Sequence, residues 1–208
     1  MSRPQTKSRH MQIIGLTGSI GMGKSTVAAI LKKFGLPIYS ADQSVHDLLK
    51  KGGRAVAPIG RLFPGTVKRG AVDRKLLGAA VFAAPDKLRQ LEKIIHPLLR
   101  SAERAFLAKA RKDKKPAAIL EIPLLFETGG EKRCDITLCV VAPRAVQQAR
   151  VLARPGMTPE KMRAILKRQM PTAEKRRRAD YVIPTGVSLE KTEAHLRKLM
   201  IKLSLLSA

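Results

Sequence analysis

The chain has 208 residues and a formal net charge of +25, from 41 Lys and Arg against 16 Asp and Glu. Its length suits one α/β domain with small insertions, and 44% hydrophobic but only 3% aromatic residues indicate a globular core of aliphatic side chains. No stretch approaches the roughly 18 apolar residues of a membrane span, so we expect no membrane partner.

The N-terminal segment 1–10 is polar and basic and lacks the apolar region of a secretory signal. We expect it to be a disordered basic arm or a cloning remnant, with Met11 as a plausible alternative start. One folded domain is predicted over residues 11–208.

Residues 18–25 read G-S-I-G-M-G-K-S and fit the phosphate-binding loop G-x-x-x-x-G-K-[ST]. An apolar strand is predicted before the loop at 12–17 and a helix after it at 26–34, which is the context that the motif requires. Inward-turned backbone N–H groups and the helix N-terminus would bind phosphate oxygens. Lys24 is expected to reach the β- and γ-phosphates, and Ser25 to offer its hydroxyl to Mg²⁺. The predicted nucleotide-binding residues of this stretch are Gly18, Ser19, Ile20, Gly21, Met22, Gly23, Lys24, Ser25 and Thr26.

A second short strand is predicted at 36–39, and Asp42 follows it closely. Open α/β sheets bind their ligands beyond the carboxyl ends of their strands, so Asp42 is a candidate site residue. An N-cap for a helix beginning at Gln43 is the alternative role, and the two roles are compatible.

The region 55–112 is predicted to be mostly helical and interrupts the alternation of strands and helices. Apolar residues at helical spacing indicate one helix over 73–82 and a longer one from Pro85. His96 and Pro97 fall within the longer helix, where proline is expected to kink or break it. We interpret this region as an insertion that binds the acceptor substrate.

Three further strands are predicted at 117–123, 135–141 and 180–183, before a closing helix at 189–206. Glu121 ends a buried strand and is therefore a candidate magnesium ligand. Five short strands separated by helices predict a parallel sheet covered by helices on both faces.

Arg150 and Arg154 are spaced to share one face of a helix predicted at 145–153. Pro155 and Gly156 end that helix, and Thr158 is the predicted N-cap of the next one. An arginine-bearing helical hairpin over about 144–172 is similar to a lid that closes on a triphosphate. The alternative is an ordinary basic surface helix.

The remaining composition favours a cytoplasmic protein. Cys134 and Cys139 lack the spacing of a metal site, and Cys139 is expected to be a buried small hydrophobe. Basic clusters occur at 111–115 and 175–178 without interleaved aromatic residues for base stacking. We interpret the charge as a solvated surface that binds nucleic acid only through non-specific electrostatic attraction.

The class of phosphate-loop protein follows partly from missing motifs. The sequence has no N-K-x-D for guanine and no D-x-x-G after the third predicted strand, which argues against a GTPase. A small-molecule kinase fits the length, the helical insertion and the arginine hairpin.

Between residue 14 and about residue 186 the chain resembles the dephospho-CoA kinase family. The resemblance is carried by G-L-T-G-S-I-G-M-G-K-S, S-A-D, D-R-x-x-L, I-I-H-P, I-P-L-L-F-E and Q-x-x-R-x-x-x-R, followed by Gln169 and the pair Ala179 and Asp180. Three departures occur: Ser40 and Glu121 stand where aspartate is usual, and residues 184–186 replace a usual asparagine.

The resemblance implies a P-loop kinase that transfers the γ-phosphoryl group of ATP to the 3′-hydroxyl of dephospho-CoA in coenzyme A biosynthesis. It implies catalytic roles for Asp42, Lys24 and Arg150, with Arg154 also on the ATP side. The implied acceptor-binding residues are Thr17, Asp42, Arg74, Phe82, His96 and Leu124. Mg²⁺ would accompany ATP and contact Ser25, Glu121 and, through water, Asp42.

Two other functions stay open: a kinase of another small acceptor, such as a nucleotide or a sugar acid, and a nucleic-acid-binding ATPase. For the kinase we expect a monomer or a weak homo-oligomer.

Overall fold

The computed structural model describes residues 10–82 and 84–207, without the side chain of Phe82. The basic arm predicted at 1–10 lies outside the described residues except for His10. The chain forms two compact units, one made of Met1–Tyr39 and Ala110–Ala208 and the other of Ser40–Lys109. Within the described ranges, none of the helices has the length and apolarity needed to cross a membrane.

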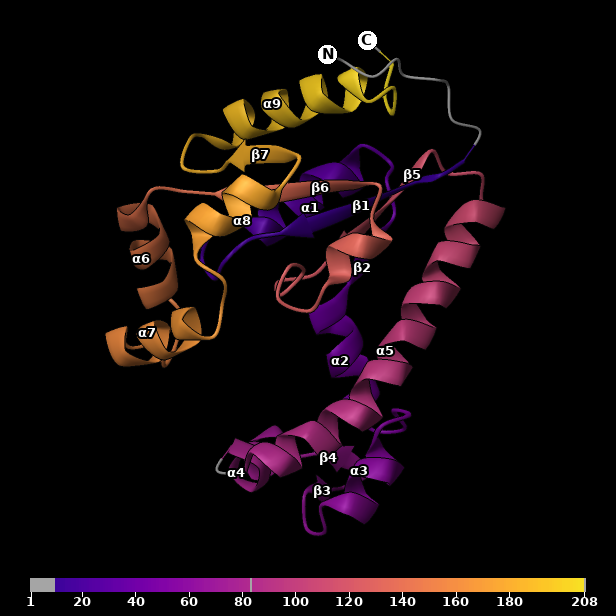
Figure 1. Ribbon diagram of the computed structural model, residues 1–208, viewed down its shortest axis with the longest axis vertical. Helices are drawn as coiled ribbons and strands as arrows, with labels where there is room; N and C mark the ends of the chain where they lie inside the picture. Colours follow the sequence, from indigo (N-terminus) through magenta and orange to yellow (C-terminus); the bar gives the residue numbers. More distant parts are fainter. Residues whose placement is uncertain (1–9, 83, 208) are drawn as a thin grey trace. The chain divides into compact units, whose positions relative to one another are not determined.

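The first unit is built on the predicted five-stranded parallel sheet (Figure 1). The structure shows that its strand order is β2-β5-β1-β6-β7. The strand β1 lies between β5 and β6, with Ile14 opposite both Ile119 and Ile136. The phosphate-binding loop therefore begins at the carboxyl end of the central strand. The strands are β1 (Gln12–Thr17), β2 (Ile38–Ser40), β5 (Ala117–Glu121), β6 (Ile136–Val141) and β7 (Tyr181–Pro184).

One face of this sheet is covered by α1 (Lys24–Lys33) and α9 (Leu189–Lys202). Figure 1 shows α9 running beside β7, and the two helices also contact each other. Alternate strand residues, such as Leu16 and Leu138, point into this core because side chains alternate between the faces of a sheet.

The other face is covered by η1 (Gly130–Arg133), which contacts β1, and by α8 (Thr172–Arg178), which contacts β6. Two more helices, α6 (Arg144–Leu152) and α7 (Pro159–Lys167), contact each other as the predicted hairpin. Cys139 is fully buried as expected, and burial raises the pKa of its thiol to about 11.

The second unit has its own small core, which includes Leu48, Ile59, Phe63, Val72 and Leu77. Beside its helices it contains an antiparallel hairpin, with Val67 opposite Val72, in the region that was predicted to be mostly helical. Its elements are α2 (Ala41–Leu49), α3 (Val56–Leu62), β3 (Val67–Lys68), β4 (Ala71–Val72), α4 (Arg74–Phe82) and α5 (Pro85–Lys112), whose last residues belong to the first unit.

Proline at 97 was expected to kink or break the long helix, and the break does not occur, because α5 continues through this residue. Proline inside a helix removes one hydrogen bond and costs about 3 kcal/mol. Apolar residues on both sides of Pro97 pack against the second core, and this packing offsets the cost. They are Leu91, Ile94, Ile95, Leu98 and Leu99.

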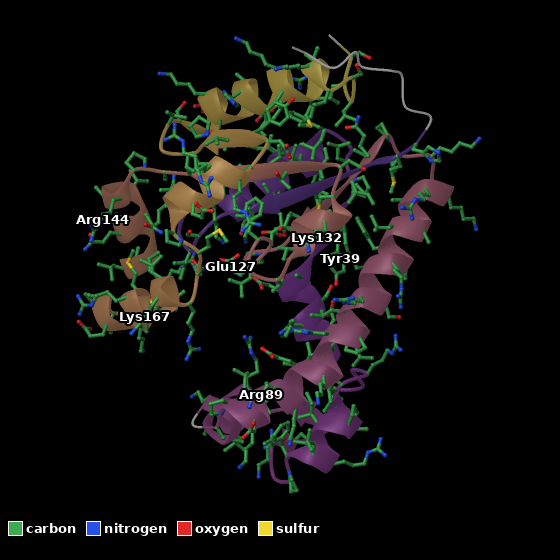
Figure 2. The ribbon with its side chains drawn as sticks, in the orientation of Figure 1. Tyr39, Arg89, Glu127, Lys132, Arg144 and Lys167 are labelled. Carbon is green, nitrogen blue, oxygen red and sulfur yellow. The ribbon has the colours of Figure 1, made fainter. Side chains whose placement is uncertain are left out.

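A buried ion pair joins α8 to the segment that follows β5. The Lys175 side chain is 0% exposed, and its Nζ lies 2.9 Å from Glu127 Oε1 and 2.7 Å from the carbonyl oxygen of Pro123. Glu127, labelled in Figure 2, also accepts a 2.7 Å hydrogen bond from the backbone N–H of Met170. The first residue of the basic cluster 175–178 is thus a core residue, whereas the other three are exposed.

Lys175→Met should lower the free energy of unfolding by about 3–5 kcal/mol, because it leaves the Glu127 carboxylate without its cation. Adding Glu127→Gln should recover part of the loss, since the amide carries no charge. Chemical denaturation of both variants measures these changes. Parent-like stability of Lys175→Met would show that the pair does not stabilise the fold.

Candidate active site

The phosphate-binding loop depends on glycines at two left-handed positions, Gly21 with φ of 77° and Gly23 with φ of 84°. Space is restricted as well. A Cβ on Gly23 would lie 2.9 Å from Thr185 Oγ1 and 3.3 Å from Arg150 Nη1, which is closer than side chains tolerate. The loop conformation and the close approach of its neighbours therefore both require glycine.

Two glutamine side chains hold the peptide groups of Ile20 from outside the loop. The Ile20 N–H donates to Gln169 Oε1 at 3.0 Å, and its carbonyl oxygen accepts from Gln147 Nε2 at 2.8 Å. Gln147 belongs to α6, and Gln169 lies between α7 and α8. Two contacts thereby connect the arginine-bearing hairpin to the loop, one from α6 and one from the residues just after α7.

The hydroxyl of Ser19 lies 3.0 Å from that of Thr172 at the start of α8, which adds a third contact between the loop and this part of the chain. No role was predicted for Thr172. Gln147 and Gln169 belong to the motifs of the family resemblance, but their contacts with Ile20 were not predicted, because these residues are far from the loop in the chain.

Lys24 and Glu121 form a largely buried ion pair within this site. Lys24 Nζ lies 3.2 Å from Glu121 Oε1, and the two side chains are 13% and 11% exposed. Ser25 and Thr26, by contrast, are exposed on the first turn of α1. The N–H groups of a first helical turn have no partners within the helix, and they carry the positive end of its dipole. A phosphate group can accept hydrogen bonds from these N–H groups, and the positive end of the dipole stabilises its negative charge.

The two predicted lid arginines have different positions. Arg150 lies on α6 and donates from Nη2 to the carbonyl oxygen of Thr185 at 2.7 Å, with Nη1 3.4 Å from Thr185 Oγ1. Arg154 is exposed and follows the end of α6, so the prediction that both share one helix is wrong at Arg154. Its contact with ATP stays a prediction.

The predicted acceptor residues of the first unit are Thr17 and Leu124. Thr17 is fully buried, and its hydroxyl donates to the carbonyl oxygen of Pro123 at 3.1 Å. Leu124 follows directly in the chain and is 38% exposed. The side chain of Leu124 is therefore accessible to a ligand, whereas the Thr17 hydroxyl holds the segment that follows β5 in place.

The other predicted acceptor residues belong to the second unit, where Asp42, Arg74 and His96 are all exposed. The cap role considered for Asp42 is wrong: Ser40 is the N-cap of α2, and its hydroxyl accepts from the N–H of Gln43 at 3.4 Å. Asp42 is the second residue of the helix, and its carboxylate is not needed as a cap. Phe82 ends α4, and its side chain lies outside the described part of the chain.

His96 belongs to a basic surface that the sequence analysis did not identify. A hollow of about 560 Å³ lies along one side of α5 (Arg89 is labelled in Figure 2). It is lined by Arg89, Glu92, Lys93, His96, Pro97, Arg100 and Arg104. The helical spacing of these residues could have indicated the shared face, but not the hollow.

A parallel sheet with a G-x-x-x-x-G-K-S loop after its central strand, and an arginine helix beside that loop, define a P-loop kinase. The sequence also matches the dephospho-CoA kinase family over residues 12–190. The chain therefore belongs to the dephospho-CoA kinase family, and it is an enzyme.

Named relatives are similar to this chain in sequence over most of their length. The chain is 57% identical over 166 residues to a dephospho-CoA kinase of Paramagnetospirillum magneticum, covering 80% of this chain and 78% of that protein. It is 50% identical over 190 residues to that of Rhodopseudomonas palustris, covering 91% and 94%. The solved dephospho-CoA kinase of Campylobacter jejuni is 27% identical with a TM-score of 0.69, covering 92% and 96%.

Lys24→Met should reduce turnover about 10²- to 10³-fold, because one electrostatic contact to the transferred phosphate is lost. It also leaves Glu121 buried without its cation, so stability should fall too. Adding Glu121→Gln should restore stability but not turnover. Steady-state kinetics and thermal unfolding of both variants measure the two effects, and parent-like turnover of Lys24→Met would contradict the site.

Proposed function

We propose that the chain transfers the γ-phosphoryl group of ATP to the 3′-hydroxyl of dephospho-CoA, with the loop at residues 18–25 as its phosphate site. Its family acts in coenzyme A biosynthesis through this ATP-dependent reaction. The observation that carries the proposal is the position of Lys24, whose ammonium group lies beside the Glu121 carboxylate at the base of the loop.

Phosphoryl transfer has a loose transition state, so catalysis consists mainly of alignment and charge neutralisation. Lys24 would move from Glu121 to the phosphate oxygens when ATP binds. Arg150 and the N–H groups of the loop would bind the negative charge that grows on the β–γ bridge and the γ-oxygens. Arg154 would add positive charge on the ATP side.

Mg²⁺ is the expected metal, because it binds oxygen ligands and commonly uses one or two protein groups together with water and phosphate oxygens. The exposed Ser25 hydroxyl and the Glu121 carboxylate fit this requirement, and Asp42 would contribute through water. The described residues contain no group of three or more acidic, His or Cys side chains that would hold a metal alone. When bound, the ion would neutralise phosphate charge.

On the acceptor side, Asp42 would orient the 3′-hydroxyl and accept its proton as the new O–P bond forms and the β–γ bridge breaks. Arg74, Phe82, His96, Leu124 and Thr17 are proposed to bind or position the acceptor. The basic hollow on α5 suits the diphosphate of dephospho-CoA, since four Lys and Arg side chains line it against one glutamate. A cytoplasmic location and a monomeric or weakly oligomeric state stay predictions.

An acceptor panel tests the reaction directly. ATP consumption by the parent enzyme should be stimulated by dephospho-CoA and not by adenosine, AMP or shikimate, because only dephospho-CoA combines a free ribose 3′-hydroxyl with a diphosphate. Mass spectrometry of the product should show one added phosphoryl group. Greater turnover with AMP or shikimate would contradict the proposed acceptor.

Asp42→Asn should keep the melting temperature and lower kcat at least about a hundredfold, because general-base assistance is worth about 10² to 10⁴. Ser40→Ala is the matched control two residues away. It removes the helix cap, which costs about 1 kcal/mol of stability, and should leave kcat near the parent value. Parent-like turnover of Asp42→Asn would direct the search for the base to Glu121.

A further inference from the structure

We propose that Thr185 is a positioning residue that holds the guanidinium of Arg150 at the phosphate-binding loop. The inference rests on the proposed role of Arg150 in binding phosphate charge. Thr185 follows directly after β7, and no loop or lid motif includes it.

The hydrogen bonds of Thr185 determine which way its hydroxyl faces. Oγ1 lies 2.6 Å from the carbonyl oxygen of Met22, 3.2 Å from that of Val141 and 3.4 Å from Arg150 Nη1. A hydroxyl has a single proton, and the short contact to Met22 takes it. A lone pair of the same oxygen is then left to accept from Arg150.

The main chain of Thr185 provides a second hydrogen bond to Arg150. Its carbonyl oxygen accepts from Nη2 at 2.7 Å, so the two terminal nitrogens of one guanidinium contact the same residue. The N–H of Thr185 donates to the Val141 carbonyl oxygen at 2.8 Å, which fixes this residue to the end of β6. Thr185 is only 3% exposed, whereas Arg150 is exposed.

These contacts hold the Arg150 guanidinium next to the phosphate-binding loop. A Cβ on Gly23 would meet both Thr185 and Arg150, so the guanidinium lies beside the residue that precedes Lys24. An exposed arginine otherwise samples many rotamers. If Thr185 fixes the planar guanidinium of Arg150 in advance, the arginine side chain loses less conformational entropy in the transition state.

Thr185→Val removes the hydroxyl and keeps the shape, and Thr185→Ser keeps the hydroxyl. We expect Thr185→Val to lower kcat about tenfold or more with an unchanged KM for dephospho-CoA, and Thr185→Ser to restore kcat to within about twofold of the parent. Equal kcat values for the two variants would overturn the inference, because the hydroxyl would then have no special role.

A double-mutant cycle with Arg150→Ala tests whether Thr185 acts through Arg150. In the Arg150→Ala background, Thr185→Val should change kcat by less than about twofold. The same tenfold loss there would overturn the inference, since Thr185 would act through Met22 alone.

The cycle also separates this inference from the proposed function. If Arg150→Ala lowers kcat and Thr185→Val does not, only the role of Thr185 fails. If Arg150→Ala has parent kcat, the proposed role of Arg150 fails and Thr185 has nothing to position.

Arg150→Lys covers the case in which Thr185→Val does not fold. It keeps the charge but cannot make both contacts, so its kcat should fall nearly as far as that of Arg150→Ala. Parent-like kcat of Arg150→Lys would overturn the inference, because charge alone would then suffice.

Discussion

The phosphate-binding loop must keep backbone N–H groups turned inward and free for a ligand, and much of the first unit serves this constraint. The loop has an internal hydrogen bond from the Met22 N–H to the Ser19 carbonyl oxygen at 3.2 Å, and the surrounding chain supplies further contacts. Gln147 and Gln169 take both polar groups of the Ile20 peptide, and Thr185 takes the carbonyl oxygen of Met22. The site is therefore ordered before ATP binds.

The Lys24–Glu121 pair follows from the same requirement. Under the proposed role of Lys24, its ammonium group must lie close to the loop and is partly buried there, and a buried ammonium needs a partner. Glu121 provides that partner and can be exchanged for phosphate oxygens of like charge. A glutamate has one more methylene than the aspartate usual in the family, which lets its carboxylate extend further from the strand. One carboxylate can in this way stabilise the free enzyme and remain available as an oxygen ligand in the complex.

Local patterns were sufficient to predict the sheet, the loop and most helices, because each depends on residues close together in the chain. The contacts that complete the site could not be predicted in this way. Thr185 and Met22 are 163 positions apart, and Gln169 and Ile20 are 149 apart. Lys175 is the clearest failure of a local rule: it opens a run of four basic residues that indicates a solvated surface, yet its side chain is 0% exposed. Glu127 and the Pro123 carbonyl oxygen, which come from a distant segment, account for its burial.

The large positive charge does not stabilise the fold. Asp47, Asp86, Glu160 and Glu174 each pair with a Lys or Arg three positions away in the same helix or at its end. These exposed pairs contribute little to stability, and they use up acidic groups that could otherwise neutralise distant bases. With 41 Lys and Arg against 16 Asp and Glu, most of the positive charge of the chain has no acidic counterpart. Such a field raises the rate at which polyanions reach the surface, and both ATP and dephospho-CoA are polyanions. Under the proposed function, this charge would favour substrate capture.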